Sequence, residues 1–123
     1  RGDLHSLPTR RSSGLVSMGD APEKPDPKGF INLSKKLLED KLGPSNIPIA
    51  YVGDTIADIK TVINAKKEIP SQKFISIALA PPHLHSKSRL KERNLYEKNL
   101  QESGADLILN SINELEDINF DLF

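Results

Sequence analysis

The sequence contains no cysteine, so the chain can form neither a disulfide nor a thiolate metal site. It also contains no tryptophan, and its two tyrosines and four phenylalanines require that the core be built mainly from aliphatic side chains. Because proteins of the reducing cytoplasm rarely need disulfides, the lack of cysteine agrees with a cytoplasmic protein, and this is the location we expect.

Neither sign of charge is in excess, because 17 lysine and arginine residues balance 17 aspartate and glutamate residues. A chain without net charge has no general electrostatic attraction to nucleic acid or to an anionic membrane, so we expect neither as a partner. No apolar run approaches the roughly 20 residues that span a bilayer. The length of 123 residues allows one small domain with a core of moderate extent.

The first 17 residues have no helical or strand periodicity and contain several serines. Residues 4–13 also resemble a translated sequencing adaptor. We therefore expect residues 1–17 to be a disordered or foreign tail, and residues 18–123 to form the domain.

The most informative stretch is residues 47–59, where a short apolar run from Ile49 to Val52 is closed by Gly53 and followed by a helical pattern. This pattern predicts a buried parallel strand, with glycine permitting a sharp exit from it. Asp54 then lies at the carboxyl end of the strand, and Asp58 follows about one helical turn later. Carboxylates are ligands that Mg²⁺ prefers, and this edge of a parallel sheet is where α/β folds bind ligands.

Strand and helix patterns alternate along the chain. Strands are expected at 49–52, 74–79 and 106–109, and helices at about 27–42, 55–66 and 87–103, with a short one starting at 111. This order predicts an α/β fold, a three-layer Rossmann-like parallel sheet with helices on both faces. The expected buried stripes of the three longer helices are Phe30, Leu33, Leu37 and Leu38, then Ile56, Ile59, Val62 and Ile63, then Leu90, Leu95, Tyr96 and Leu100.

Two segments resemble motifs of the haloacid dehalogenase (HAD) superfamily of phosphohydrolases. Residues 53–58, Gly-Asp-Thr-Ile-Ala-Asp, resemble its fourth motif, GDxxxD. Upstream, residues 23–30 resemble its third motif, in which a lysine, here Lys24, stands in a Lys-Pro-x-Pro setting before a helix. GDxxxD alone is a weak signal, but the two motifs in this order with one helix between them are specific. The resemblance covers roughly Met18 to Leu115.

The resemblance implies a partial HAD core, the carboxyl-terminal half of an enzyme whose cap lies between motifs one and two. Such enzymes act on small phosphorylated metabolites through an aspartyl-phosphate intermediate. Lys24 is then the catalytic cation that stabilises the phosphoryl group and its attacking aspartate. Asp54 and Asp58 bind Mg²⁺ directly or through water, and Gly53 and Thr55 support them.

The first motif of that family, a DxDx(T/V) segment that carries the nucleophilic aspartate, does not occur in the 123 residues. The serine or threonine of the second motif is also not found. We therefore expect this polypeptide on its own to be inactive, with the phosphatase activity belonging to an intact parent.

The same residues have simpler interpretations. Lys24 can be a solvated loop lysine, and an aspartate after a strand often only caps the next helix. Two carboxylates four positions apart repel each other when ionised, which a bound cation would offset. The alternative function is a non-catalytic Mg²⁺-binding or interaction module of the same fold. His83 and His85 form a His-x-His pair of the kind that ligates zinc, but no third ligand is near in sequence, so zinc is not expected.

Overall fold

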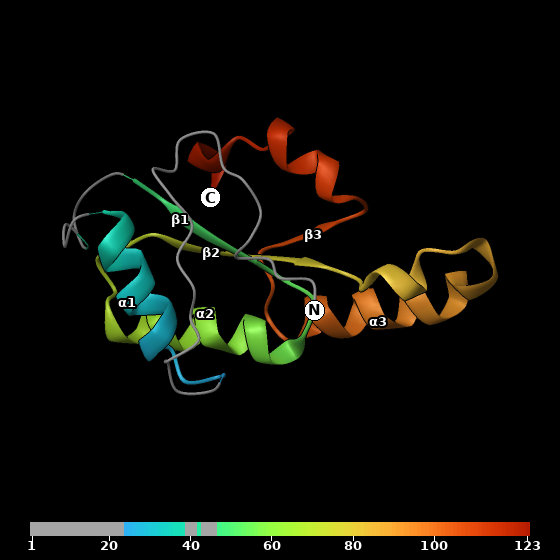
Figure 1. Cartoon of the computed structure of the whole chain (residues 1–123), viewed down its shortest axis with the longest axis horizontal. Helices are drawn as coiled ribbons and strands as arrows, with labels where there is room; N and C mark the ends of the chain where they lie inside the picture. Colours follow the sequence, from blue (N-terminus) through green and yellow to red (C-terminus); the bar gives the residue numbers. More distant parts are fainter. Residues whose placement is uncertain (1–23, 39–41, 43–46) are drawn as a thin grey trace.

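Three parallel strands form the centre of the computed structural model, which describes residues 24–38, 42 and 47–123 (Figure 1). The strands β1 (Ile49–Gly53), β2 (Phe74–Leu79) and β3 (Leu107–Leu109) lie in the order β1-β2-β3. The last residue of β1, Gly53, lies opposite Ala78 of β2. The three predicted strands are confirmed to within one residue at each end, so the protein has the expected α/β architecture around a parallel sheet.

All three α-helices of the described residues, α1 (Lys28–Leu37), α2 (Ile56–Glu68) and α3 (Leu90–Glu102), lie on one side of the sheet (Figure 1). The other side carries two short 3-10 helices, η4 (Ile112–Asp117) and η5 (Phe120–Leu122). Helices were expected on both faces, but among the described residues the second face is covered by short 3-10 helices.

The core has two halves because side chains alternate between the two faces along each strand. On the side of the α-helices, the buried apolar residues are Phe30, Ile31, Ile49, Ile59, Val62, Ala65, Phe74, Ala78 and Leu100. On the side of the 3-10 helices, they are Ile75, Ile77 and Leu109, with half-buried Leu115, Ile118 and Phe120 packed against them. The expected aliphatic core is therefore present, with only two buried aromatic rings.

Several apolar residues predicted to be buried are exposed. The exposed fractions are 37% for Leu37, 42% for Ile56, 55% for Leu90 and 61% for Leu95. In α1 the buried stripe is rotated relative to the prediction. Ile31 and Ser34 are buried beside Phe30, whereas the predicted Leu33 and Leu37 are not buried. In α3 the amino-terminal half extends beyond the strands, so only Leu100 is fully buried (Figure 1).

The helix signals were correct in kind but not always in position. A helix was expected from about residue 27, whereas α1 starts at Lys28 and the Asp26 carboxylate accepts a hydrogen bond from the Lys28 N–H at 2.9 Å. Gly104 follows the end of α3 with a φ of 110°, a backbone conformation that glycine adopts without steric cost. The capping box at Ser111 is present, although the helix that it starts is a 3-10 helix.

The predicted tail at 1–17 falls outside the described residues, as do residues 39–41 of the helix expected at about 27–42. Within the described ranges, no helix combines the length and the apolar character needed to cross a membrane.

Candidate functional site

The candidate site lies where β1 ends and the chain turns into α2. Gly53 is buried there, and a Cβ atom on it would lie 2.4 Å from the Cβ and 2.5 Å from the Cγ of Asp58. The prediction gave Gly53 a role in the exit of the backbone from the strand, but its φ is not in the positive region. Its function here is steric, because only a residue without a side chain lets Asp58 fold back against the end of β1.

Asp58 binds the turn that precedes it. Its Oδ2 atom accepts hydrogen bonds from the backbone N–H groups of Asp54 and Thr55, both at 3.1 Å, and from the Thr55 hydroxyl at 2.9 Å. Thr55 Oγ1 in turn accepts from the Asp58 N–H at 3.1 Å, which completes a capping box at the start of α2. The supporting hydrogen bonds expected of Thr55 are therefore present, and so is the capping role that the simpler interpretation gave to an aspartate.

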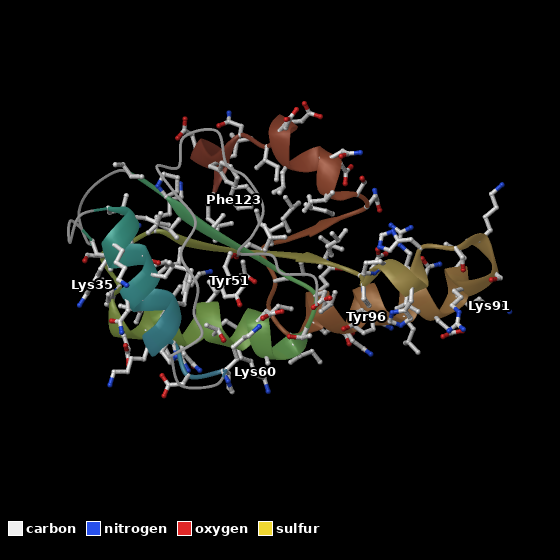
Figure 2. The ribbon with its side chains drawn as sticks, in the orientation of Figure 1. Lys35, Tyr51, Lys60, Lys91, Tyr96 and Phe123 are labelled. Atoms are coloured by element: carbon white, nitrogen blue, oxygen red, sulfur yellow. The ribbon has the colours of Figure 1, made fainter. Side chains whose placement is uncertain are left out.

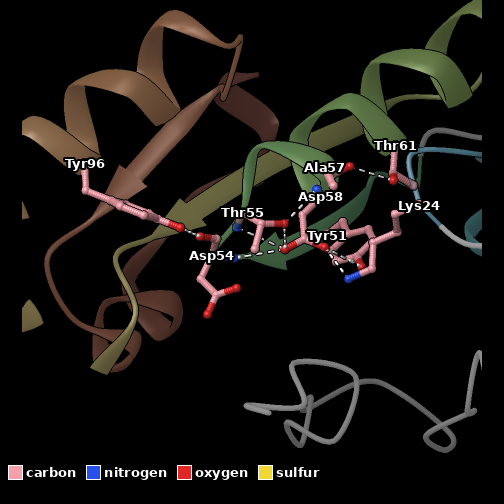
Figure 3. Close-up of polar contacts among 8 residues, drawn as sticks. All are labelled: Lys24, Tyr51, Asp54, Thr55, Ala57, Asp58, Thr61 and Tyr96. Carbon is pink, nitrogen blue, oxygen red and sulfur yellow. Dashed lines mark hydrogen bonds and ion pairs between the residues drawn. The ribbon is translucent and has the colours of Figure 1, made fainter. Parts of the chain in front are cut away.

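The second oxygen of Asp58 binds a lysine that is 34 positions away in the sequence (Figure 3). Lys24 Nζ lies 2.5 Å from Asp58 Oδ1, and the Tyr51 hydroxyl donates to the same oxygen at 3.1 Å. The Asp58 side chain is only 4% exposed, while that of Lys24 is 42% exposed. The ammonium group is thus held by a buried carboxylate and still reaches the surface.

These contacts shift the ionisation of the cluster. Burial by itself raises the pKa of the Asp58 carboxyl, but the hydrogen bond and charge of Lys24, with the bonds from Thr55 and Tyr51, hold that pKa below its usual value. Burial lowers the pKa of Lys24, but the hydrogen bond and charge of Asp58 and the interactions with Tyr51 together outweigh burial, so the net pKa is raised. Burial and the Asp58 charge raise the pKa of the Tyr51 phenol. At neutral pH the cluster is therefore an ion pair with a neutral phenol as donor.

The stability of the fold should depend on pH through this pair. A lowered pKa means that Asp58 contributes stability above its usual pKa of 3.8, and that this contribution is lost as the pH falls through the folded value. The raised pKa of Lys24 means that its contribution is complete below 10.5 and lost as the pH rises through the folded value. We expect the urea midpoint to be constant from roughly pH 5 to 9 and to fall on both sides.

An Asp58→Asn variant is the control for this pH dependence, because it removes the titrating group and keeps its size. Its urea midpoint should fall less steeply between roughly pH 5 and 2 than that of the original chain. Equal acid slopes in the two proteins would contradict the assignment of this dependence to Asp58.

Asp54 has its backbone fixed and its side chain free within the described part of the chain. Its N–H donates to Asp58, and its carbonyl accepts a hydrogen bond from the hydroxyl of Tyr96 on α3. Its carboxylate makes no hydrogen bond or ion pair with any residue that the structure describes, and it points away from Lys24 and Asp58 in Figure 3. Burial and the charge of Asp54 raise the pKa of Tyr96, which keeps this phenol a donor as well.

The predicted site residues Lys24, Gly53, Asp54, Thr55 and Asp58 come together at the carboxyl end of β1, as expected of the two motifs. Their chemical roles stay predictions. The two tyrosines were missed, although both reach the turn, from the sheet and from α3 (Figure 2).

A signal for Tyr51 was available, because it lies two positions before Gly53 on a strand and so on the same face. No pattern in the sequence pointed to Tyr96, which is 42 positions from Asp54. The histidine pair shows no sign of a metal site: His85 Nε2 is 2.7 Å from the Ala80 carbonyl oxygen, and the described residues contain no cluster of three or more potential ligands.

The donors present fit Mg²⁺ unequally. A carboxylate has about four lone-pair sites, and Asp58 already accepts five hydrogen bonds, so it has no acceptor site left for direct ligation. The free carboxylate of Asp54 is a suitable hard oxygen ligand. Direct coordination by Asp54, with Asp58 acting on Lys24 and the turn, is the arrangement that agrees with these contacts.

Neither a protein-family model, nor a curated protein, nor a solved structure gives a significant match to this chain.

Proposed function

We propose that this chain is the carboxyl-terminal part of the core of a HAD-like phosphohydrolase and that it acts on a small phosphorylated metabolite. The observation that carries the proposal is the contact between Lys24 and Asp58. A lysine in a Lys-Pro-x-Pro setting and the second aspartate of a GDxxxD segment form an ion pair at 2.5 Å across 34 positions. The pair lies beside Asp54, at the edge of the sheet where α/β folds bind ligands.

In this proposal the ammonium group of Lys24 stabilises negative charge on a phosphoryl group and on the aspartate that attacks it. Asp58 fixes the position of that ammonium and keeps it charged, and through three hydrogen bonds it also fixes the turn. The nucleophilic aspartate would come from a part of the parent protein other than these 123 residues, because no DxDx(T/V) segment occurs among them.

Mg²⁺ is the cofactor that the motifs imply, and Asp54 is the residue that would hold it here. When bound, such an ion neutralises charge on the transferring phosphoryl oxygens. The role of this chain is then to present one free carboxylate from a turn whose backbone is hydrogen-bonded on both sides of Asp54.

The proposal predicts that the 123-residue chain alone releases no phosphate above background from an aryl phosphate in millimolar Mg²⁺. The reason is chemical, since positioning and a metal ion do not replace a covalent nucleophile in this mechanism. The assay compares the chain with an Asp54→Asn variant at equal concentration. Turnover that is present in the chain and lost in the variant would show that the chain carries its own catalytic machinery, and the proposal of a half-enzyme would fail.

The complete reading frame distinguishes the enzyme from the alternative, a non-catalytic Mg²⁺-binding or interaction module. Determining the genomic reading frame that encodes residues 18–123 should reveal a DxDx(T/V) segment upstream of them if the enzyme proposal holds. A complete frame without that segment would favour the module, because the fold alone does not determine the function.

A further inference from the structure

Both tyrosines of this chain place their hydroxyl groups on the turn at residues 54–58, although one lies on β1 and the other on α3 (Figures 2 and 3). The Tyr51 hydroxyl donates to the carboxylate of Asp58, and the Tyr96 hydroxyl donates to the carbonyl of Asp54. The turn is therefore held from two sides by neutral donors on rings that are packed against other residues.

Tyr51 acts on the ion pair. Its hydroxyl binds the same Asp58 oxygen that Lys24 binds, and its ring centroid lies 5.9 Å from the Lys24 ammonium nitrogen. The ring is itself fixed by packing on Phe30, with centroids 5.1 Å apart. The Lys24 ammonium is thus bordered on one side by the Asp58 carboxylate and on another by the Tyr51 ring.

Tyr96 acts on Asp54. The N–H of Asp54 is already bound by Asp58, so the hydrogen bond from Tyr96 fixes its other backbone group and leaves the carboxylate as its free polar group. The ring of Tyr96 packs against the cluster of Ile59 and Leu100, where α2 and α3 meet under the sheet. The backbone position from which the Asp54 side chain extends is thereby tied to the position of α3.

We propose that the two phenols are positioning residues with separate roles, Tyr96 orienting Asp54 toward a divalent cation and Tyr51 holding Lys24 on Asp58. The chemical purpose of this arrangement rests on the function proposed above, but the two roles are properties of this chain alone. If the two hydroxyls only satisfied hydrogen bonds in the core, removing one of them would not affect the Asp54 side and the Lys24 side selectively.

The test compares Tyr51→Phe with Tyr96→Phe, each of which keeps its ring and serves as the matched control for the other. The first readout is the affinity for Mg²⁺ alone, which is measured from the amide NMR signals of Asp54 and Thr55 during a titration. The second is the ¹⁵N signal of the Lys24 ammonium, identified by its loss in Lys24→Met. We expect Tyr96→Phe to weaken Mg²⁺ binding by about tenfold and to leave the ammonium signal in place.

Tyr51→Phe should do the reverse, broadening or shifting the ammonium signal while the Mg²⁺ affinity changes less than about twofold. Equal effects of both variants on both readouts, or no effect of either, would overturn the proposal. If the original chain binds Mg²⁺ and Tyr96→Phe binds it equally well, the role of Tyr96 fails and the proposed function stands. If the original chain binds no Mg²⁺, the role of Tyr96 fails together with the metal part of the proposed function. The ammonium signal alone then decides the role of Tyr51.

A fluorine label gives a second measurement should one variant not fold. The chain labelled with 3-fluorotyrosine has two ¹⁹F signals, because it has two tyrosines and any one folded variant assigns both. Mg²⁺ should shift the Tyr96 signal more than the Tyr51 signal, and Lys24→Met should do the opposite. The same response of both signals in both experiments would contradict separate roles.

Discussion

Replacing Asp58 with alanine is expected to lower the free energy of unfolding by about 3 kcal/mol, measured by urea denaturation at neutral pH. The variant leaves five donors without their acceptor, namely the Lys24 ammonium, the Tyr51 hydroxyl, the Thr55 hydroxyl and two backbone N–H groups. The figure lies at the lower end of the range for broken buried ion pairs, because Lys24 is 42% exposed and water replaces part of the lost contact.

Asp54→Ala is the matched control, since it removes the other aspartate of the same turn. We expect it to change the free energy of unfolding by less than about 0.5 kcal/mol, because no described residue binds that carboxylate. The two variants should separate stability from metal affinity, with Asp54→Ala losing Mg²⁺ binding and keeping the fold. A loss of stability that is equal in the two variants would contradict the division of roles between the two aspartates.

Gly53→Ala is expected to cost a similar amount, about 3 kcal/mol, although it adds only a methyl group. The added carbon would lie 2.4 Å from the Cβ of Asp58, which is closer than non-bonded carbons approach one another. The turn must then open, and the bonds that Asp58 makes to Lys24 and to the backbone are weakened together. Urea denaturation measures the loss, and the Lys24 ammonium signal reports on the pair.

A thermodynamic cycle with Asp58→Gly tests whether this contact is the cause. With no side chain at position 58, adding the methyl group at Gly53 should cost less than about 1 kcal/mol. If Gly53→Ala were equally costly in both backgrounds, the reason would lie in the strand and not in the approach of Asp58.

The strands and the meeting of the two motifs could be predicted from sequence because the signals are local. The apolar run at Phe74–Leu79, for example, has the length of a buried strand. That Lys24, Asp54 and Asp58 lie at the same edge of the sheet also followed from the motifs, since the helix between them and a parallel strand return the chain there. The direct ion pair between Lys24 and Asp58 was not predicted.

The remaining details depend on packing, which the sequence does not reveal. The period of α3 placed Leu95 in a buried stripe, but the strands end before they reach it, and it is 61% exposed. The steric role of Gly53 requires knowing that Asp58 folds back, and the contact of Tyr96 requires the relative position of two helices. Likewise, only the three-dimensional structure reveals that the Asp58 carboxylate accepts five hydrogen bonds, whereas no described residue binds the Asp54 carboxylate.

The order of the strands has a consequence for how the molecule folds. Each strand pairs with the next strand along the chain, with one helix between them, so the sheet extends in one direction from β1 to β3. Each of β2 and β3 therefore pairs with the strand just before it in the sequence, across one crossover that contains an α-helix. During synthesis the unit β1-α2-β2 can form before α3 is made, because all of its strand pairing lies within residues 49–79.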